Sequence, residues 1–79
     1  MHVIRDDGSL DPELDPGLSI DRVVALYKAM VRVRVLDDRL EKLQRQGRIA
    51  FHVGAFGEEA AIIGSAAALR DHDWIVPCY

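Results

Sequence analysis

The chain has 79 residues, a length that allows one small domain at most. Its 13 acidic residues against 10 basic ones give a formal net charge of -3, which argues against a nucleic-acid-binding surface. Cys78 is the only cysteine, so an internal disulfide is excluded, and the 3 scattered histidines show no spacing typical of a zinc site.

The first 18 residues are acidic and are interrupted by prolines and glycines. Pro12 and Pro16 each disfavour helix in the residue before them. We therefore expect residues 1–18 to form an extended arm that is ordered only where it lies on another surface. The arm is unlike a signal peptide or an Arg-rich transit peptide, and no apolar run approaches the roughly 20 residues of a membrane-spanning helix. The sequence thus predicts a soluble, cytoplasmic protein with no membrane partner.

A long helix is predicted from about residue 20 to residue 46. Ser19 is a favourable N-cap, because its side chain can accept a hydrogen bond from a free N–H of the first turn. Gly47 is a natural left-handed stop at the other end. Two acid-first ion pairs are expected at the i,i+4 spacing: Asp38 with Lys42, and Glu41 with Arg45.

One face of this helix is apolar and unusually wide. Its apolar side chains recur at helical spacing, at Ile20, Val23, Leu26, Tyr27, Met30, Val33, Leu36, Leu40 and Leu43. Val31 and Val35 widen the stripe further. A stripe this wide on a long helix needs more covering surface than so short a chain supplies. We therefore expect another polypeptide, or a further part of the same protein, to cover it.

A slimmer helix, rich in alanine, is predicted to begin at residue 57 and to end at residue 69 or 70. Residues 48–55 before it are expected to form a loop or a short irregular strand. The apolar residues 74–76 after it indicate a short buried strand, whose ladder bonding Pro77 limits. Taken alone, the chain is predicted to be mostly α, with two helices and a short terminal strand.

The turn Gly54-Ala55-Phe56-Gly57 precedes the second helix, where free N–H groups could bind a phosphate. Glu58 and Glu59 oppose this interpretation, because two carboxylates already occupy the positive end of the helix. The spacing also matches neither the P-loop nor the dinucleotide-binding pattern. The same two residues are a weak candidate for a general acid–base pair, since adjacent helical side chains point about 100° apart. The alternative is structural, with one of them buried and paired.

Three further features have an ordinary and a functional interpretation. From residue 32 onward, five arginines lie on or just after the first helix: Arg32, Arg34, Arg39, Arg45 and Arg48. Acidic residues are interleaved with them, so we interpret this face as solvated and salt-bridged and not as a basic patch. His52 is a candidate proton shuttle or substrate contact, although a loop histidine is more often ordinary. Cys78 has no apparent activating neighbour and is interpreted as a small buried filler.

Four local patterns follow one another between about residue 20 and residue 79. They are Leu26-Tyr27-Lys28-Ala29-Met30 leading to Asp38-Arg39-Leu40; Leu43-Gln44-Arg45-Gln46-Gly47-Arg48-Ile49; Phe51 followed by Gly57-Glu58-Glu59-Ala60; and Gly64-Ser65-Ala66-Ala67-Ala68-Leu69 leading to Asp73 and Tyr79. No single pattern is specific. Their joint order and spacing resemble the E1 α subunit of the thiamine-diphosphate-dependent 2-oxo acid dehydrogenases.

The resemblance implies an α/β thiamin diphosphate-binding fold in the intact subunit, of which residues 19–79 would be an incomplete amino-terminal portion. It implies a heterotetramer of two α and two β chains, with thiamine diphosphate and Mg²⁺ at the α/β interface. The implied reaction is decarboxylation of a 2-oxo acid, followed by transfer of the acyl group to a lipoyl arm of a separate E2 acyltransferase. Branched-chain or broad 2-oxo acids, pyruvate and acetoin remain open as substrates, in that order of preference.

Only two site residues follow from the resemblance. Phe51 matches an aromatic residue that lines the substrate side of the pocket, and Tyr79 matches the Tyr of a Tyr-Arg pair that holds the diphosphate of the cofactor. The Arg, the magnesium-binding segment and the catalytic glutamate of the β chain are not in this chain, so no catalytic residue and no metal ligand is assigned. Cys78 is not expected before that Tyr, which weakens the assignment. The chain alone is expected to be inactive.

A small helical protein-interaction module without catalysis is the competing hypothesis. It explains the wide apolar helix equally well. It does not explain why a slim helix is followed by an apolar strand. Such a module should be a discrete, cooperatively folded oligomer, whereas a piece of a larger subunit should be soluble only together with its missing parts.

Overall fold

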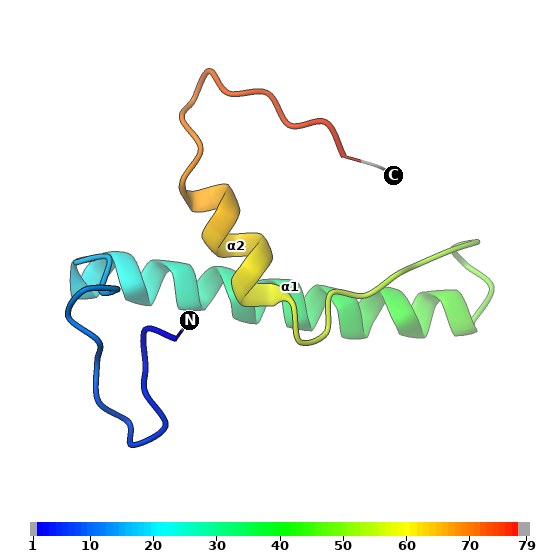
Figure 1. The fold of residues 1–79 in the computed structure, drawn as a ribbon. Helices are drawn as coiled ribbons and strands as arrows, with labels where there is room; N and C mark the ends of the chain where they lie inside the picture. The colour runs from blue at the N-terminus through cyan, green and yellow to red at the C-terminus, as the bar shows by residue number, and fades with distance from the viewer. Residues whose placement is uncertain (1, 78–79) are drawn as a thin grey trace.

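Two helices of unequal length define the fold, in a computed structural model that describes residues 2–77. α1 (Ile20–Arg45) is the long one, and α2 (Glu59–Ala67) lies over its amino-terminal half, with its start near Arg34 and its end near Arg22 (Figure 1). Residues 46–58 run back alongside α1 before α2 begins. The predictions that concern Cys78 and Tyr79 lie outside the described residues. Within residues 2–77, no helix is long and apolar enough to cross a membrane.

Local capping signals set both ends of α1. The Ser19 side chain accepts a hydrogen bond from the Arg22 N–H at 3.2 Å, as expected of an N-cap. At the other end Gly47 has a φ of +70°, a conformation that costs glycine little. Its N–H donates to the Gln44 carbonyl at 2.9 Å, and the Arg48 N–H donates to the Leu43 carbonyl at 3.0 Å, which together form a Schellman motif. The predicted first helix is confirmed.

The partly covered residues of α1 include one regular stripe. Its members recur at alternating spacings of four and three residues: Leu26, Met30, Val33, Asp37 and Leu40. The neighbouring apolar residues Tyr27 and Val35 remain 64% and 62% exposed. Among residues 2–77, no apolar side chain is fully buried. The width of the predicted apolar face is therefore left largely uncovered.

α2 is shorter at both ends than predicted. Gly57, expected to begin the helix, has a φ of +82° and belongs to the preceding turn, which the hydrogen bond from the Glu58 N–H to the Ala55 carbonyl closes at 2.9 Å. At the carboxyl end, an Arg22 Nη2 from α1 donates to the Ala67 carbonyl at 3.4 Å. This bond ties the last turn of α2 to the first turn of α1. The helix ends at Ala67, before the predicted residue 69 or 70.

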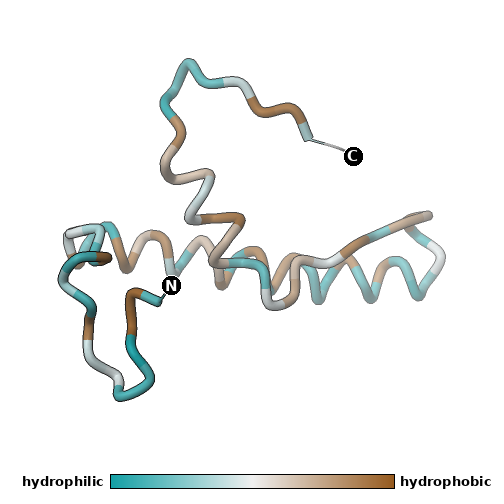
Figure 2. Tube along the Cα trace, in the orientation of Figure 1, coloured by the Kyte–Doolittle hydropathy of each residue, from teal (hydrophilic) through white to brown (hydrophobic). Residues whose placement is uncertain are grey.

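The strand predicted at residues 74–76 is wrong for the described part of the chain, which contains no strand. Trp74 and Val76 are 93% and 90% exposed. The physical reason is that a strand needs a neighbour to accept its hydrogen bonds, and residues 2–77 offer none here. Figure 2 shows this apolar segment extending away from α2.

The remaining segments are irregular. Residues 48–55 form a loop, one of the two predicted alternatives. The amino-terminal arm turns back on itself, where an antiparallel bridge joins Ile4 to Leu10. At the tip of this turn the Ser9 hydroxyl donates to Asp7 at 2.6 Å, which lowers the pKa of that carboxyl.

Candidate functional site

Two carboxylates are buried where residues 51–57, here called the 51–57 loop, lie against α1 just before α2 begins. Asp37 of α1 and Glu59 of α2 are each only 6% exposed, and they are the buried polar residues of the described chain. Burying a carboxylate is costly unless hydrogen bonds or a cation compensate for the lost water. The groups that bind these two carboxylates therefore also fix the position of the 51–57 loop on α1.

Asp37 contacts the loop through both of its oxygens. Oδ2 accepts a hydrogen bond from the Ala55 N–H at 2.6 Å, and Oδ1 lies 3.3 Å from His52 Nε2. The second contact is not a hydrogen bond, and His52 Nε2 is buried without a hydrogen-bond partner in residues 2–77. The loop also fits closely here: a Cβ on Gly54 would lie 2.9 Å from the Phe56 ring and 3.5 Å from Asp37 Oδ2. Glycine is therefore required at that position for this packing.

Glu59 is held by a second group on α1. Arg34 Nε donates to Glu59 Oε1 at 2.5 Å, and the Gly57 N–H donates to Oε2 at 3.1 Å. The hydrogen bond from Arg34 is the main reason that the pKa of Glu59 is lowered, and the same bond raises the pKa of Arg34. The Arg34 guanidinium also lies over the Phe56 ring, 5.1 Å from its centroid. The loop is thus attached to α1 at two successive turns of the helix.

These contacts decide between the interpretations of the two adjacent glutamates. Glu59 is the buried and paired one, whereas Glu58 is exposed and its side chain makes no capping hydrogen bond. A carboxylate neutralised by Arg34 is poorly suited to take up a proton near neutral pH, because its pKa is lowered. The structural interpretation is confirmed for Glu59.

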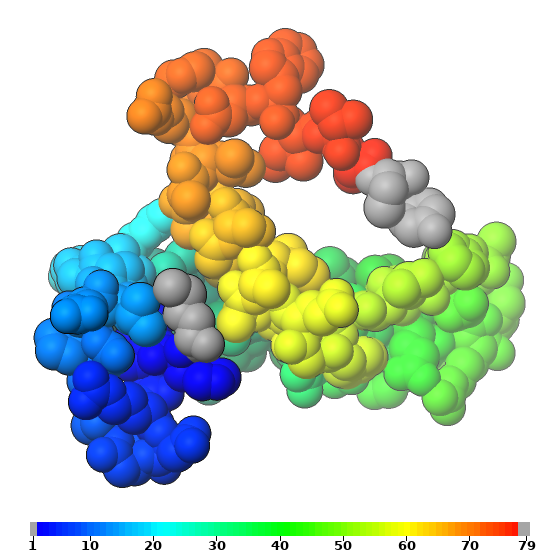
Figure 3. Space-filling view, viewed as in Figure 1, coloured from blue at the N-terminus to red at the C-terminus, as the bar shows by residue number. Residues whose placement is uncertain are grey.

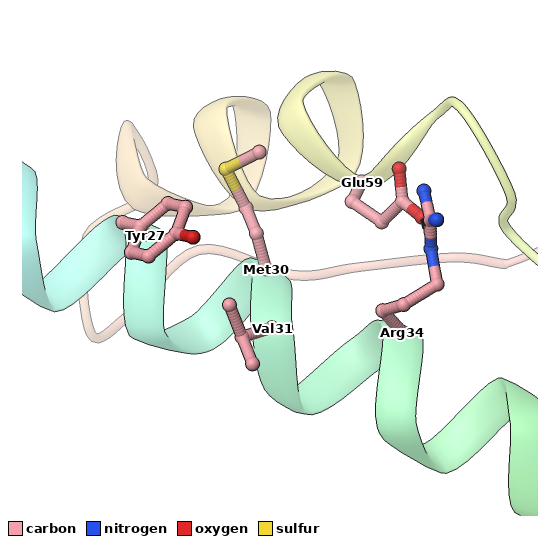
Figure 4. Close-up of a pocket in the computed structure, with 5 residues that line it drawn as sticks. All are labelled: Tyr27, Met30, Val31, Arg34 and Glu59. Atoms are coloured by element: carbon pink, nitrogen blue, oxygen red, sulfur yellow. Dashed lines mark hydrogen bonds and ion pairs between the residues drawn. The ribbon is translucent and has the colours of Figure 1, made fainter.

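A groove of about 230 Å³ lies beside this ion pair on α1 (Figure 4). It is lined by Tyr27, Met30, Val31, Arg34 and Glu59, with the two charged residues together at one end. Because Arg34 and Glu59 neutralise each other, the groove offers mainly apolar contact. This lining suits packing against another apolar surface better than acid–base chemistry.

A second hollow of about 470 Å³ lies between α2 and residues 74–76 (Figure 3). Its lining is apolar except for Ser65 and consists of Ile62, Ser65, Ala66, Leu69, Trp74, Ile75 and Val76. No charged residue that could act on a substrate is among them.

The predicted site residues are placed as follows. Phe51 projects from the loop and is 70% exposed. His52 turns inward, with its side chain 12% exposed beside Asp37. Tyr79 lies outside the described residues. No cluster of three potential metal ligands occurs within residues 2–77, so this part of the chain does not assemble a magnesium site by itself.

The arginine-rich face is salt-bridged in part. Arg45 pairs with Glu41 as predicted, and Arg34 pairs with Glu59 of α2. The structure shows no ion pair between Asp38 and Lys42 among the residues it describes, so that predicted pair is wrong.

Asp37 is the residue that the sequence analysis missed. Its charge alone places it among the solvated acidic residues that are interleaved with the arginines of the first helix, but the residue is buried. The signal was present in the spacing, because Asp37 lies four residues after Val33 and three before Leu40, on the covered stripe. A charged residue at such a position is a candidate for a specific buried contact.

Comparison with known proteins shows a consistent pattern. A family model described as "Dehydrogenase E1 component" matches residues 27–79. The chain is 47% identical over 68 residues to the 2-oxoisovalerate dehydrogenase subunit alpha of Dictyostelium discoideum, covering 86% of the chain and 15% of that protein. It is 41% identical over 70 residues to the human protein of the same name, covering 89% of the chain and 16% of that protein.

A pyruvate dehydrogenase E1 component subunit alpha from Staphylococcus epidermidis is 36% identical over 80 residues, covering 100% of the chain and 22% of that protein. The chain therefore spans about a fifth or less of the length of these curated relatives. No solved structure matches it significantly.

Proposed function

Because the chain belongs to the dehydrogenase E1 component family, we propose that it is the amino-terminal part of an E1 α subunit that acts on a 2-oxo acid. The observation that carries this proposal is the family match, which begins within α1 and continues through α2. In the intact subunit, residues 19–79 would begin an α/β thiamin diphosphate-binding domain, with residues 1–18 as an arm ahead of it.

The proposed assembly pairs this subunit with a second α chain and two E1 β chains, and it passes its acyl product to the lipoyl arm of an E2 acyltransferase. The uncovered apolar surfaces support such an assembly. Trp74 and Val76 are almost fully exposed, and so is much of the wide face of α1. Apolar surface of this extent is characteristic of protein that is covered by other protein.

The proposed cofactors are thiamine diphosphate and Mg²⁺. When bound, thiamine diphosphate supplies an electron sink for the electron pair that stays on the substrate carbon when carbon dioxide leaves. The described residues supply no set of metal ligands, so Mg²⁺ would be held by other parts of the assembly. The contribution proposed for this chain is Phe51, whose exposed ring would line the substrate side of the pocket and keep water away from it. Tyr79 is proposed to contact the diphosphate.

We propose a branched-chain 2-oxo acid as the preferred substrate. The two relatives named for 2-oxoisovalerate are 47% and 41% identical to the chain, against 36% for the one named for pyruvate. Pyruvate is the second candidate and acetoin the third.

The test is an assay of the complete α subunit, co-purified with its β subunit and supplied with thiamine diphosphate and Mg²⁺. We expect decarboxylation of 3-methyl-2-oxobutanoate with a higher kcat/KM than of pyruvate, and little turnover of acetoin. Preference for pyruvate would overturn the substrate assignment alone. Failure to turn over any of the three compounds would overturn the proposed function.

A helical interaction module without catalysis is the second candidate, favoured by the exposed apolar face of α1. Size-exclusion chromatography and circular dichroism of the 79-residue chain distinguish the two proposals. A module should form a discrete oligomer that melts cooperatively, whereas the first part of a larger subunit should not.

A further inference from the structure

The amino-terminal half of the loop between the helices has few attachments. Backbone hydrogen bonding continues from α1 to the Arg48 N–H and resumes where the Glu58 N–H donates to the Ala55 carbonyl. Between these two points, the polar contacts that the structure shows within residues 2–77 go to Asp37, through the Ala55 N–H and the His52 ring. One side chain of α1 therefore determines where this stretch lies.

Asp37 also determines which way the loop faces. The His52 side chain is only 12% exposed beside Asp37, whereas the adjacent Phe51 is 70% exposed. Because Phe51 directly precedes His52 in the chain, the contact that places His52 against Asp37 also limits where Phe51 lies.

The packing behind the loop leaves little room for a different arrangement. The Phe56 ring approaches Gly54 so closely that a Cβ there would lie 2.9 Å from it, and Arg34 covers the same ring from α1.

We propose that Asp37 is a positioning residue for Phe51: by accepting a hydrogen bond from the Ala55 N–H and lying in contact with the His52 ring, it sets the position of the aromatic side chain that contacts the 2-oxo acid. This inference rests on the proposed function. Asp37 itself touches neither substrate nor cofactor in this proposal. Its role concerns substrate recognition, so it should appear in KM more than in kcat.

The test uses the complete α subunit with its β subunit and compares Asp37→Asn with Asp38→Asn. The asparagine side chain keeps the shape of Asp37 but offers a single oxygen in place of two acceptors. Asp38 is the matched control, because it is the adjacent aspartate on α1 and is exposed. For Asp37→Asn we expect KM for the 2-oxo acid to rise about tenfold, the factor that corresponds to about 1.4 kcal/mol, with kcat within about twofold. Asp38→Asn should leave both constants unchanged.

A double-mutant cycle separates positioning from a general loss of structure. In a Phe51→Leu background, Asp37→Asn should change KM by less than about twofold, because the side chain that Asp37 positions is already gone. An effect of the same size in both backgrounds would overturn the proposal. If Asp37→Asn does not co-purify with the β subunit, His52→Gln replaces it, with the same expected rise in KM and the same cycle.

The outcomes distinguish a failure of the positioning role of Asp37 from a failure of the proposed function. An active wild-type enzyme whose KM is unaffected by Asp37→Asn or by His52→Gln overturns the positioning role and leaves the proposed function in place. A wild-type assembly that turns over no 2-oxo acid overturns the function and this inference with it.

Discussion

Two carboxylates, those of Asp37 and Glu59, are buried among residues 2–77, and no apolar side chain is. Glu59 forms an ion pair with Arg34. A buried charge in an ion pair adds little net stability, because the loss of water offsets much of the attraction between the charges. Removing Arg34 is costly, however, since the Glu59 carboxylate is then left buried without its cation. At the scale of single residues, the Arg34–Glu59 pair and the contacts of Asp37 therefore specify how the loop meets α1. They are not replaceable one at a time.

The first prediction concerns the pH dependence of the Glu59 contribution. Its pKa is lowered from 4.5 in the folded chain, so Glu59 stabilises the fold fully above that value and loses this contribution as pH falls through its folded pKa. In the assembled subunit, Glu59→Gln should lower the Tm by several degrees near neutral pH. The difference from wild type should shrink as pH falls below 4.5, through the lowered pKa of Glu59 in the folded chain.

Thermal melts of both proteins across this pH range measure the effect. Glu58→Gln is the matched control, because Glu58 is the exposed neighbour and should show little difference from wild type at any pH. A gap between Glu59→Gln and wild type that stays constant with pH would contradict the assignment of the lowered pKa to this pair.

At the scale of elements, α1 is defined by signals within its own sequence. The Ser19 cap and the Schellman motif at Gly47 are local contacts, which is why residues 20–46 could be predicted almost to the residue. α2 was predicted less well. Its start depends on the turn at Gly57 and on Glu59 reaching Arg34, a contact between residues 25 positions apart that local patterns do not reveal.

The second prediction tests the end of α1. Gly47→Ala places a Cβ at a φ of +70° and should cost about 1 kcal/mol, so the last turn of α1 frays. Circular dichroism of the 79-residue chain should show lower helicity. Gly64→Ala is the matched control, because a Cβ at Gly64 would meet no atom within 4 Å and its φ is not positive. It should raise helicity, and a loss of equal size in both variants would contradict the assignment.

The same distinction between local and long-range signals explains the errors at the site. The apolar, β-branched pattern of residues 74–76 is typical of a strand, but pairing depends on a neighbour outside the local sequence. The sequence allowed a loop at residues 48–55, but it did not indicate which loop side chain would be exposed and which would turn inward. The position of Phe51 is set by Asp37, which a reading of charge alone assigns to the solvent.

At the scale of the whole molecule, the chain is open. Its radius of gyration is 15.9 Å. A compact domain of this length would have a radius of about 11.6 Å. Its principal extents are 48 × 35 × 24 Å. They reflect the long α1, the short α2 attached to it, and an apolar segment after α2 that extends away from both helices. The surface that a closed domain would bury remains at the outside.

The third prediction follows from this openness. The purified 79-residue chain should bind hydrophobic dyes, melt without a sharp transition and decarboxylate no 2-oxo acid. Trp74 is the single tryptophan and is 93% exposed, so its emission should hardly change when denaturant is added. A folded, monomeric chain with a sharp melt and a buried tryptophan would contradict the proposal that other protein covers these surfaces.

The exposed segment Trp74–Val76 has a consequence for synthesis of the proposed subunit. During translation of the proposed subunit, α1 and this apolar segment would emerge from the ribosome before the later parts of the polypeptide that would cover them. Each nascent chain would therefore expose apolar surface that can aggregate with other proteins until the later parts are made. The growing subunit should accordingly be a chaperone client from its earliest stage.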